Sequence, residues 1–117
     1  MINQENNPEF LNDFLAYSST ILNKSENSVK EYNYDINHFL KYIKFKFKLT
    51  DVKDEEFIKT IDIKDFDIKT LERITLQDIH AFLGYLKECY QSKPATLARK
   101  TSTIRIFFKY MCNKTKR

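Results

Sequence analysis

Apolar residues recur at spacings of three and four along most of the chain, the period of a helix buried on one face. The first such stretch predicts a helix that begins at Asn7-Pro8, with Asn7 as N-cap and Pro8 in the first helical position. A second, longer stretch predicts an amphipathic helix over roughly residues 26–46, capped by Ser25. Its apolar face carries Val29, Tyr32, Ile36, Phe39, Leu40, Ile43 and Phe47.

Two further helices are expected in the second half of the chain. Thr75 opens the third, with Asp78 placed as in a capping box. Gly84 lies in its middle, where glycine costs about 1 kcal/mol relative to alanine, and close packing against another helix would explain it. After a break at 91–94, the fourth helix buries a face that includes Leu97, Ile104, Phe107 and Met111. Its opposite face is expected to carry Arg99, Ser102, Thr103 and Ile106, with Thr96 at the edge.

Residues 48–73 follow neither pattern clearly. Isoleucines alternate with charged residues over 61–68, and alternation is typical of a strand. No other part of the chain alternates, so such a strand would lack a partner. We therefore expect a connecting segment with short helical turns near 54–59 and 68–72, its apolar residues packed against the helices.

Composition narrows the fold class. The chain has 117 residues, 42% of them hydrophobic, with one glycine and two prolines. This length suits a single domain spanning 1–117 with its own core. The scarcity of glycine and proline argues against sandwiches, barrels, Rossmann units and P-loops, which need them in turns and phosphate loops. The prediction is an all-α domain of four main helices.

Charge adds a candidate partner. The net charge is only +4, but residues 93–117 contain eight basic residues and no acidic one, whereas residues 49–79 contain nine acidic and five basic residues. Such asymmetry favours binding to nucleic acid, with a solvated basic end as the alternative. Residues 24–48, which include the second helix, also carry an excess of positive charge.

Other chemistry receives little support. Cys89 and Cys112 lack CxxC spacing, which favours a reduced cytosolic protein, with a disulfide as the alternative. The two histidines, His38 and His80, and the two cysteines do not form a zinc pattern. The sequence contains no membrane-spanning apolar run and no signal peptide. We expect no metal, no cofactor, no small-molecule substrate and no membrane association.

Three segments carry a family resemblance when taken in order. They are Ser25-x-Asn27-Ser28 with Tyr32-x-x-Asp35-Ile36, then Ile74-Thr75-x-x-Asp78-Ile79, then Arg99-Lys100-x-Ser102-x-Ile104-Arg105-x-Phe107-Phe108. Together, over about residues 9–112, the chain resembles the N-terminal core-binding domain of tyrosine site-specific recombinases, the phage integrase and Xer group. Two departures from the family pattern occur in the second helix: Ser28 replaces the usual threonine, and Asn33 and Tyr34 stand where basic residues are frequent.

The resemblance implies a SAM-like orthogonal helical bundle that forms a clamp around duplex DNA together with a separate C-terminal catalytic domain. It implies that the second and fourth helices meet the major groove, into which a helix fits. The partners would be double-stranded DNA and neighbouring recombinase protomers. The tyrosine nucleophile and its activators would belong to the C-terminal domain, so that no residue of this chain would be catalytic.

The candidate DNA-binding residues are hydroxyl and basic side chains of these two helices, which suit phosphates or guanine edges. They are Ser28, Lys30, Lys93, Thr96, Arg99, Lys100, Thr103 and Arg105. Lys114, Lys116 and Arg117 would steer the chain toward DNA or begin a linker. Two competing hypotheses are a helical protein–protein interaction module with a solvated basic face and a helix-turn-helix repressor. The third helix is too long for the repressor motif.

Overall fold

The computed structural model describes residues 4–115, with side chains described through Asn113, and within these residues it contains helices and no strand. The elements are α1 (Glu9–Thr20), α2 (Glu26–Lys46), the 3-10 helix η1 (Glu55–Thr60), α3 (Ile68–Leu71), α4 (Leu76–Tyr90) and α5 (Pro94–Thr115). The all-α prediction is confirmed, including its four main helices. The side chains of Lys114, Lys116 and Arg117 lie outside the described residues.

Capping side chains set where these helices begin. The Ser25 hydroxyl accepts a hydrogen bond from the Ser28 backbone N–H at 3.1 Å, as expected for the start of α2. Thr75 and Asp78 form a complete capping box at α4. The prediction for α1 is wrong by one residue, because Pro8 is the N-cap. Asn7 is instead buried, and its amide donates to Asn12 and Asn33.

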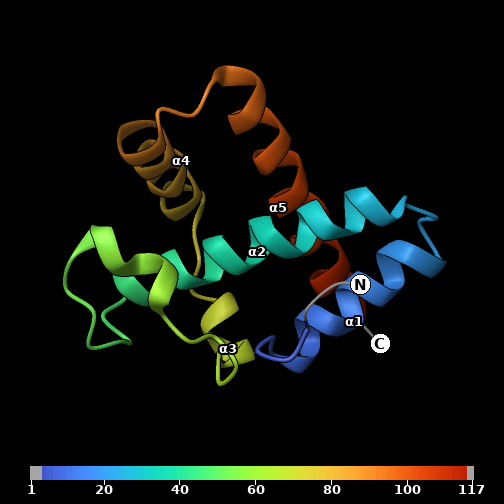
Figure 1. Cartoon of the computed structure of the whole chain (residues 1–117). Helices are drawn as coiled ribbons and strands as arrows, with labels where there is room; N and C mark the ends of the chain where they lie inside the picture. The colour runs from blue at the N-terminus through green and yellow to red at the C-terminus, as the bar shows by residue number, and fades with distance from the viewer. Residues whose placement is uncertain (1–3, 116–117) are drawn as a thin grey trace.

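Helix α2 runs through the middle of the molecule and organises the other helices (Figure 1). On its N-terminal half, Tyr32 stacks on Phe14 of α1, with ring centroids 5.9 Å apart. On its C-terminal half, Phe39 meets Phe82 of α4 edge to face at 5.2 Å. Helix α5 crosses α2, and its Phe107 meets Phe14 at 5.2 Å. Phe14, Phe39, Phe82 and Phe107 have no exposed surface, so one aromatic core joins the four main helices.

The connection between α2 and α4 packs against the bundle as an irregular segment. It forms η1 and α3 where short helical turns were expected. Ile58, Ile61 and Ile63 are buried, whereas Asp62 and Lys64 are exposed. The alternation over 61–64 therefore reflects a segment with one face on the core, and no sheet is needed to bury it. The pattern does not continue to residue 68, because 64–65 form a turn and Ile68 is 43% exposed at the start of α3.

Gly84 provides the first prediction, which concerns stability. A Cβ atom added at Gly84 would have no neighbouring heavy atom within 4 Å, so the expectation of close packing there is wrong. We expect Gly84→Ala to raise the free energy of unfolding by about 0.5–1 kcal/mol, because alanine loses less backbone entropy in a helix. Thermal and urea unfolding measure this change. An unchanged or lower stability would contradict it.

Candidate nucleic-acid interface

A buried carboxylate lies where α2 and α5 cross. Asp35 of α2 is 1% exposed, and its side chain is held entirely by α5. Its Oδ1 accepts a hydrogen bond from Lys100 Nζ at 2.6 Å, and its Oδ2 accepts one from Arg99 Nη1 at 2.7 Å. Breaking such a buried pair is costly because it leaves an uncompensated charge. These bonds therefore fix the angle and register at which α5 crosses α2.

The sequence of α5 explains how one carboxylate gains several partners. Arg99, Lys100 and Thr103 are spaced so that one helical turn presents all three toward α2. The single hydroxyl proton of Thr103 has two acceptors within reach, the Arg99 carbonyl oxygen at 3.2 Å and Asp35 Oδ2 at 3.4 Å. We name Asp35, Arg99, Lys100 and Thr103 the crossing cluster.

Arg99 is the member of the crossing cluster that remains open to solvent. Its side chain is 42% exposed, and Nη1 also lies 3.1 Å from Glu31 Oε2. A guanidinium has five N–H donors in a planar fork, so contacts through Nη1 leave other donors for a ligand. Asp35 and Glu31 thus orient the Arg99 guanidinium at the surface of the α2–α5 crossing.

Lys100 and Thr103 are both candidates for DNA contact from the sequence, with Thr103 expected on the outer face of α5, yet both are buried in the structure. Lys100 is 6% exposed and Thr103 is 2% exposed. The Lys100 ammonium lies 5.0 Å from the centre of the Tyr34 ring in addition to its bond to Asp35. The placement of Thr103 on the outer face is wrong, because the buried Asp35 draws this side of α5 inward. In this structure both residues act first as structural partners of Asp35.

The remaining predicted residues do not form one continuous group. Ser28 belongs to the α2 cap, where its hydroxyl accepts from Ser25 at 3.0 Å. Lys30 is exposed, and its Nζ lies 3.8 Å from Glu26 Oε1. Lys93 is exposed just before α5, and Thr96 is partly exposed in its first turn. Arg105 lines a groove between α5 and the start of α4, away from the crossing cluster.

Sequence reasoning missed Asp35 and Glu31 as parts of the site. In the sequence Asp35 stands out only as a position of the family motif. The available signal was an aspartate within the amphipathic second helix. If such a carboxylate is buried, it requires a cation from another element. Only the tertiary structure shows that Asp35 is buried and that its cations are Arg99 and Lys100.

His38 lies near the crossing cluster, buried among the rings of Phe82, Tyr85 and Tyr90, and it is neutral in the folded chain. Its Nε2 lies 2.8 Å from the Tyr85 hydroxyl. Burial, assisted by the charges of Lys59, Lys100 and Lys41, lowers the pKa of His38 from 6.5 to about 3. Within the described residues Nδ1 has no hydrogen-bond partner, so the tautomer with its proton on Nε2 avoids a buried, unpaired N–H.

The structure offers little support for other kinds of site. Among the described residues, no three His, Cys, Asp or Glu side chains are grouped so that they could hold a metal ion. Cys89 and Cys112 are both free and exposed. In the part of the chain that the structure describes, no helix has the length and apolar character needed to cross a bilayer.

Comparisons with known proteins agree with the resemblance noted from the three motifs. The family model described as phage integrase, N-terminal SAM-like domain, matches residues 55–115, just over half of the chain. Tyrosine recombinase XerC of Caldanaerobacter subterraneus subsp. tengcongensis is 34% identical over 109 residues, which cover 93% of this chain and 30% of the relative. No solved structure was found to match. The chain is thus a member of the phage integrase N-terminal SAM-like domain family.

Proposed function

We propose that the chain binds double-stranded DNA across the α2–α5 crossing, as the DNA-gripping domain of a tyrosine recombinase or integrase at its core recombination site. The half-exposed Arg99 guanidinium carries the proposal, because Asp35 and Glu31 orient it where α2 and α5, the two most basic of the four main helices, meet. A preoriented guanidinium loses little entropy when it binds a phosphate or a guanine edge. Lys30, Lys93 and Thr96 supply further phosphate contacts along α2 and the start of α5, and Arg105 supplies a separate one on another side of α5.

In this proposal the chain contributes grip and alignment, and it supplies no catalytic residue. Cleavage and rejoining of strands through a phosphotyrosyl link would be the work of another domain of the whole recombinase. The chain spans about 30% of the length of its XerC relative. Neighbouring protomers on the same DNA would be its protein partners, and the cytoplasm its place of action.

Arg99→Gln tests this function directly. We expect duplex DNA to bind about tenfold more weakly, because one phosphate or base contact is worth about 1–3 kcal/mol. The slope of log K against log salt should become shallower by about 0.9 if the lost contact is to a phosphate. Fluorescence anisotropy with a labelled duplex at several salt concentrations measures both quantities.

Arg73→Gln is the matched control for this experiment. It removes the same charge from an exposed arginine just after α3, in the acidic connection between α2 and α4. We expect this variant to bind DNA as the unaltered chain does. Equal losses in the two variants, or no DNA binding even at low salt, would contradict the proposed interface.

A second candidate function is binding to a protein partner. An apolar groove of about 280 Å³ lies between the start of α4 and α5, lined in part by Ile74, Ile79 and Phe108. Leu76 at its edge is 67% exposed and extends the apolar surface of the groove. If the chain fails to bind DNA at low salt, the groove favours protein binding over DNA binding as its function.

A further inference from the structure

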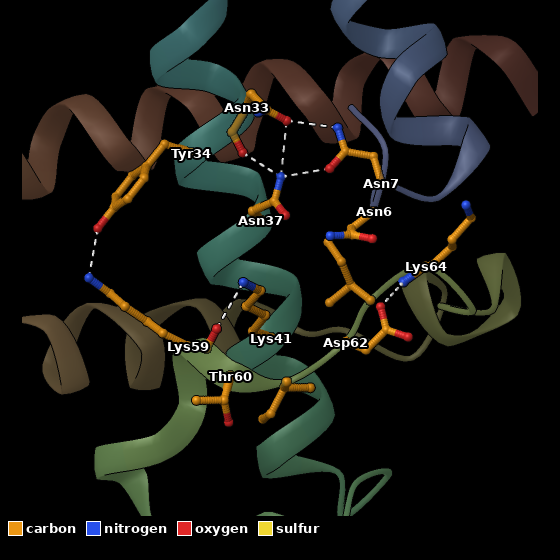
Figure 2. Close-up of a pocket in the computed structure, with 12 residues that line it drawn as sticks. Asn6, Asn7, Asn33, Tyr34, Asn37, Lys41, Lys59, Thr60, Asp62 and Lys64 are labelled. Carbon is orange, nitrogen blue, oxygen red and sulfur yellow. Dashed lines mark hydrogen bonds between the residues drawn. The ribbon is translucent and has the colours of Figure 1, made fainter. Parts of the chain in front are cut away.

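A polar pocket of about 680 Å³ lies on the side of α2 that faces η1 and the segment after it. Figure 2 shows Asn33, Tyr34, Asn37 and Lys41 of α2 on one wall, with the chain around Lys59 and Asp62 opposite them. Asn6, Asn7 and Lys64 complete its rim. We call it the asparagine–lysine pocket. It lies within the size range of sites that hold small molecules.

Three lysines of this pocket donate to neutral oxygens. Lys41 Nζ donates to the Lys59 carbonyl at 3.0 Å, and Lys59 Nζ donates to the Tyr34 hydroxyl at 2.8 Å. Lys64 Nζ donates to the Glu5 carbonyl at 3.0 Å. These bonds position the ammonium groups without neutralising their charge. Asp62 is the only acidic lining residue among those described, so the lining carries a formal charge of two positive units.

The positive charges of these lysines affect the pKa values of neighbouring groups. Burial and the charge of Lys59 lower the pKa of Lys41, although Asp62 opposes this effect. The charges of Lys59 and Lys41 also help to lower the pKa of His38. The surroundings of Lys41 therefore disfavour its positive charge, whereas the hydrogen bond to the Tyr34 hydroxyl raises the pKa of Lys59 and favours its charged form. A bound anion would relieve this repulsion, and a doubly charged one would match the formal charge of the lining.

The asparagine wall is held rigid before any ligand binds. Asn37 Nδ2 donates to Asn7 Oδ1 and to Asn33 Oδ1, at 3.0 Å in both cases. Asn7 Nδ2 donates to Asn33 Oδ1 at 2.8 Å, which closes the group (Figure 2). Tyr34, at the end of this wall, is 52% exposed. An exposed aromatic ring beside lysines suits a nucleotide, whose base can stack while its phosphate meets the cations.

We propose that the asparagine–lysine pocket binds the phosphate of a nucleotide unit, with Lys41 and Lys59 as its cationic partners and Tyr34 as the platform for the base. The nucleotide unit is either free or part of a DNA strand, and the phosphate chemistry is the same in both. Lys100 of the crossing cluster borders the pocket, with its ammonium 5.0 Å from the Tyr34 ring centre. Arg99 does not line the pocket, and the pocket's cations Lys41 and Lys59 are not members of the cluster, so the two sites can be tested separately.

Nuclear magnetic resonance titrations of the 117-residue chain test the pocket with three ligands: inorganic phosphate, deoxyadenosine monophosphate and a DNA duplex. We expect the side-chain amide signals of Asn33 and Asn37 and the backbone signals of 59–64 to shift with the mononucleotide. Shifts with phosphate alone would show the anion site without the stacking platform. Shifts with the duplex alone would assign the phosphate to a DNA strand.

Lys41→Gln removes one charge from the pocket while keeping a long, polar side chain. We expect it to weaken the binding of the mononucleotide about tenfold, as for a lost charge-assisted hydrogen bond. Lys53→Gln removes the same charge from an exposed lysine that does not line this pocket, and should leave the affinity unchanged. A melting curve confirms that each variant is folded.

Two results would overturn the pocket proposal. One is the absence of localised shifts with all three ligands, and the other is equal affinity in the Lys41→Gln and Lys53→Gln variants. The DNA-binding function fails separately, through Arg99→Gln. A duplex that shifts the α5 signals, together with no pocket shift from any of the three ligands, would retain the function and remove the pocket.

Discussion

Asp35→Ala is expected to lower the free energy of unfolding by about 3–5 kcal/mol, a large part of the stability of a domain this size. The substitution destabilises the fold because Lys100 loses its charged partner. That ammonium is nearly inaccessible to water and has Asp35 Oδ1 as its hydrogen-bond acceptor at 2.6 Å. Removing the carboxylate leaves a buried charge without compensation. Chemical denaturation of the variant, followed by circular dichroism, measures the loss.

A double-mutant cycle separates the ion pair from simple packing. Lys100→Met removes the buried ammonium and keeps an unbranched side chain, while Asp35 retains Arg99. We expect Asp35→Asn combined with Lys100→Met to cost less than the sum of the two single changes, because neither charge is then left unpaired. Strict additivity would contradict the assigned role of the pair. The same variants, measured for DNA binding, report whether a correctly oriented Arg99 requires Asp35.

Stability is also expected to fall at mildly acidic pH because of His38. Its pKa is about 3 in the folded chain and about 6.5 in the unfolded chain. The unfolded state therefore takes up a proton first as the pH drops. The contribution is fully present above pH 6.5 and is lost progressively between pH 6.5 and 3. The full difference in pKa corresponds to roughly 5 kcal/mol.

Carboxylates also titrate toward the lower end of this range, so a matched variant is needed. His38→Gln removes the titrating ring and keeps a polar group for the Tyr85 hydroxyl, at some cost in aromatic packing. The difference in unfolding free energy between the two proteins should shrink as the pH falls from 7 toward 4. A constant difference, or a His38 ring signal that titrates near 6.5 in the folded chain, would contradict the assignment.

Local signals determined most of the secondary structure. The boundaries of α2 and the start of α4 follow from Ser25 and from the Thr75–Asp78 box, whose side chains satisfy the first backbone N–H groups of their helices. Such caps act within a few residues and can be read from the chain alone. The α1 start differs because a buried Asn7 bonds to Asn33, a partner 26 residues away.

The interface was less accessible from sequence. Helical periodicity placed Arg99 correctly at the surface but also placed Thr103 outside. A helical wheel assigns faces from apolar residues and has no term for a buried carboxylate on another helix. Asp35 makes the inward face of α5 partly polar, which turns Lys100 and Thr103 from surface candidates into buried partners. The same limit concealed the asparagine–lysine pocket, which combines α2 with residues 59–64.

The sequence by itself determined an all-α domain, its four main helices, its basic C-terminal part and the motifs of its family. These properties depend on local period, on capping and on composition. The tertiary structure alone decided which charges are paired and which are free, because this depends on contacts between residues as far apart as Asp35 and Lys100. A cation acts as a structural partner when a buried carboxylate meets it, and becomes available to a phosphate when its partners are neutral or leave donors exposed.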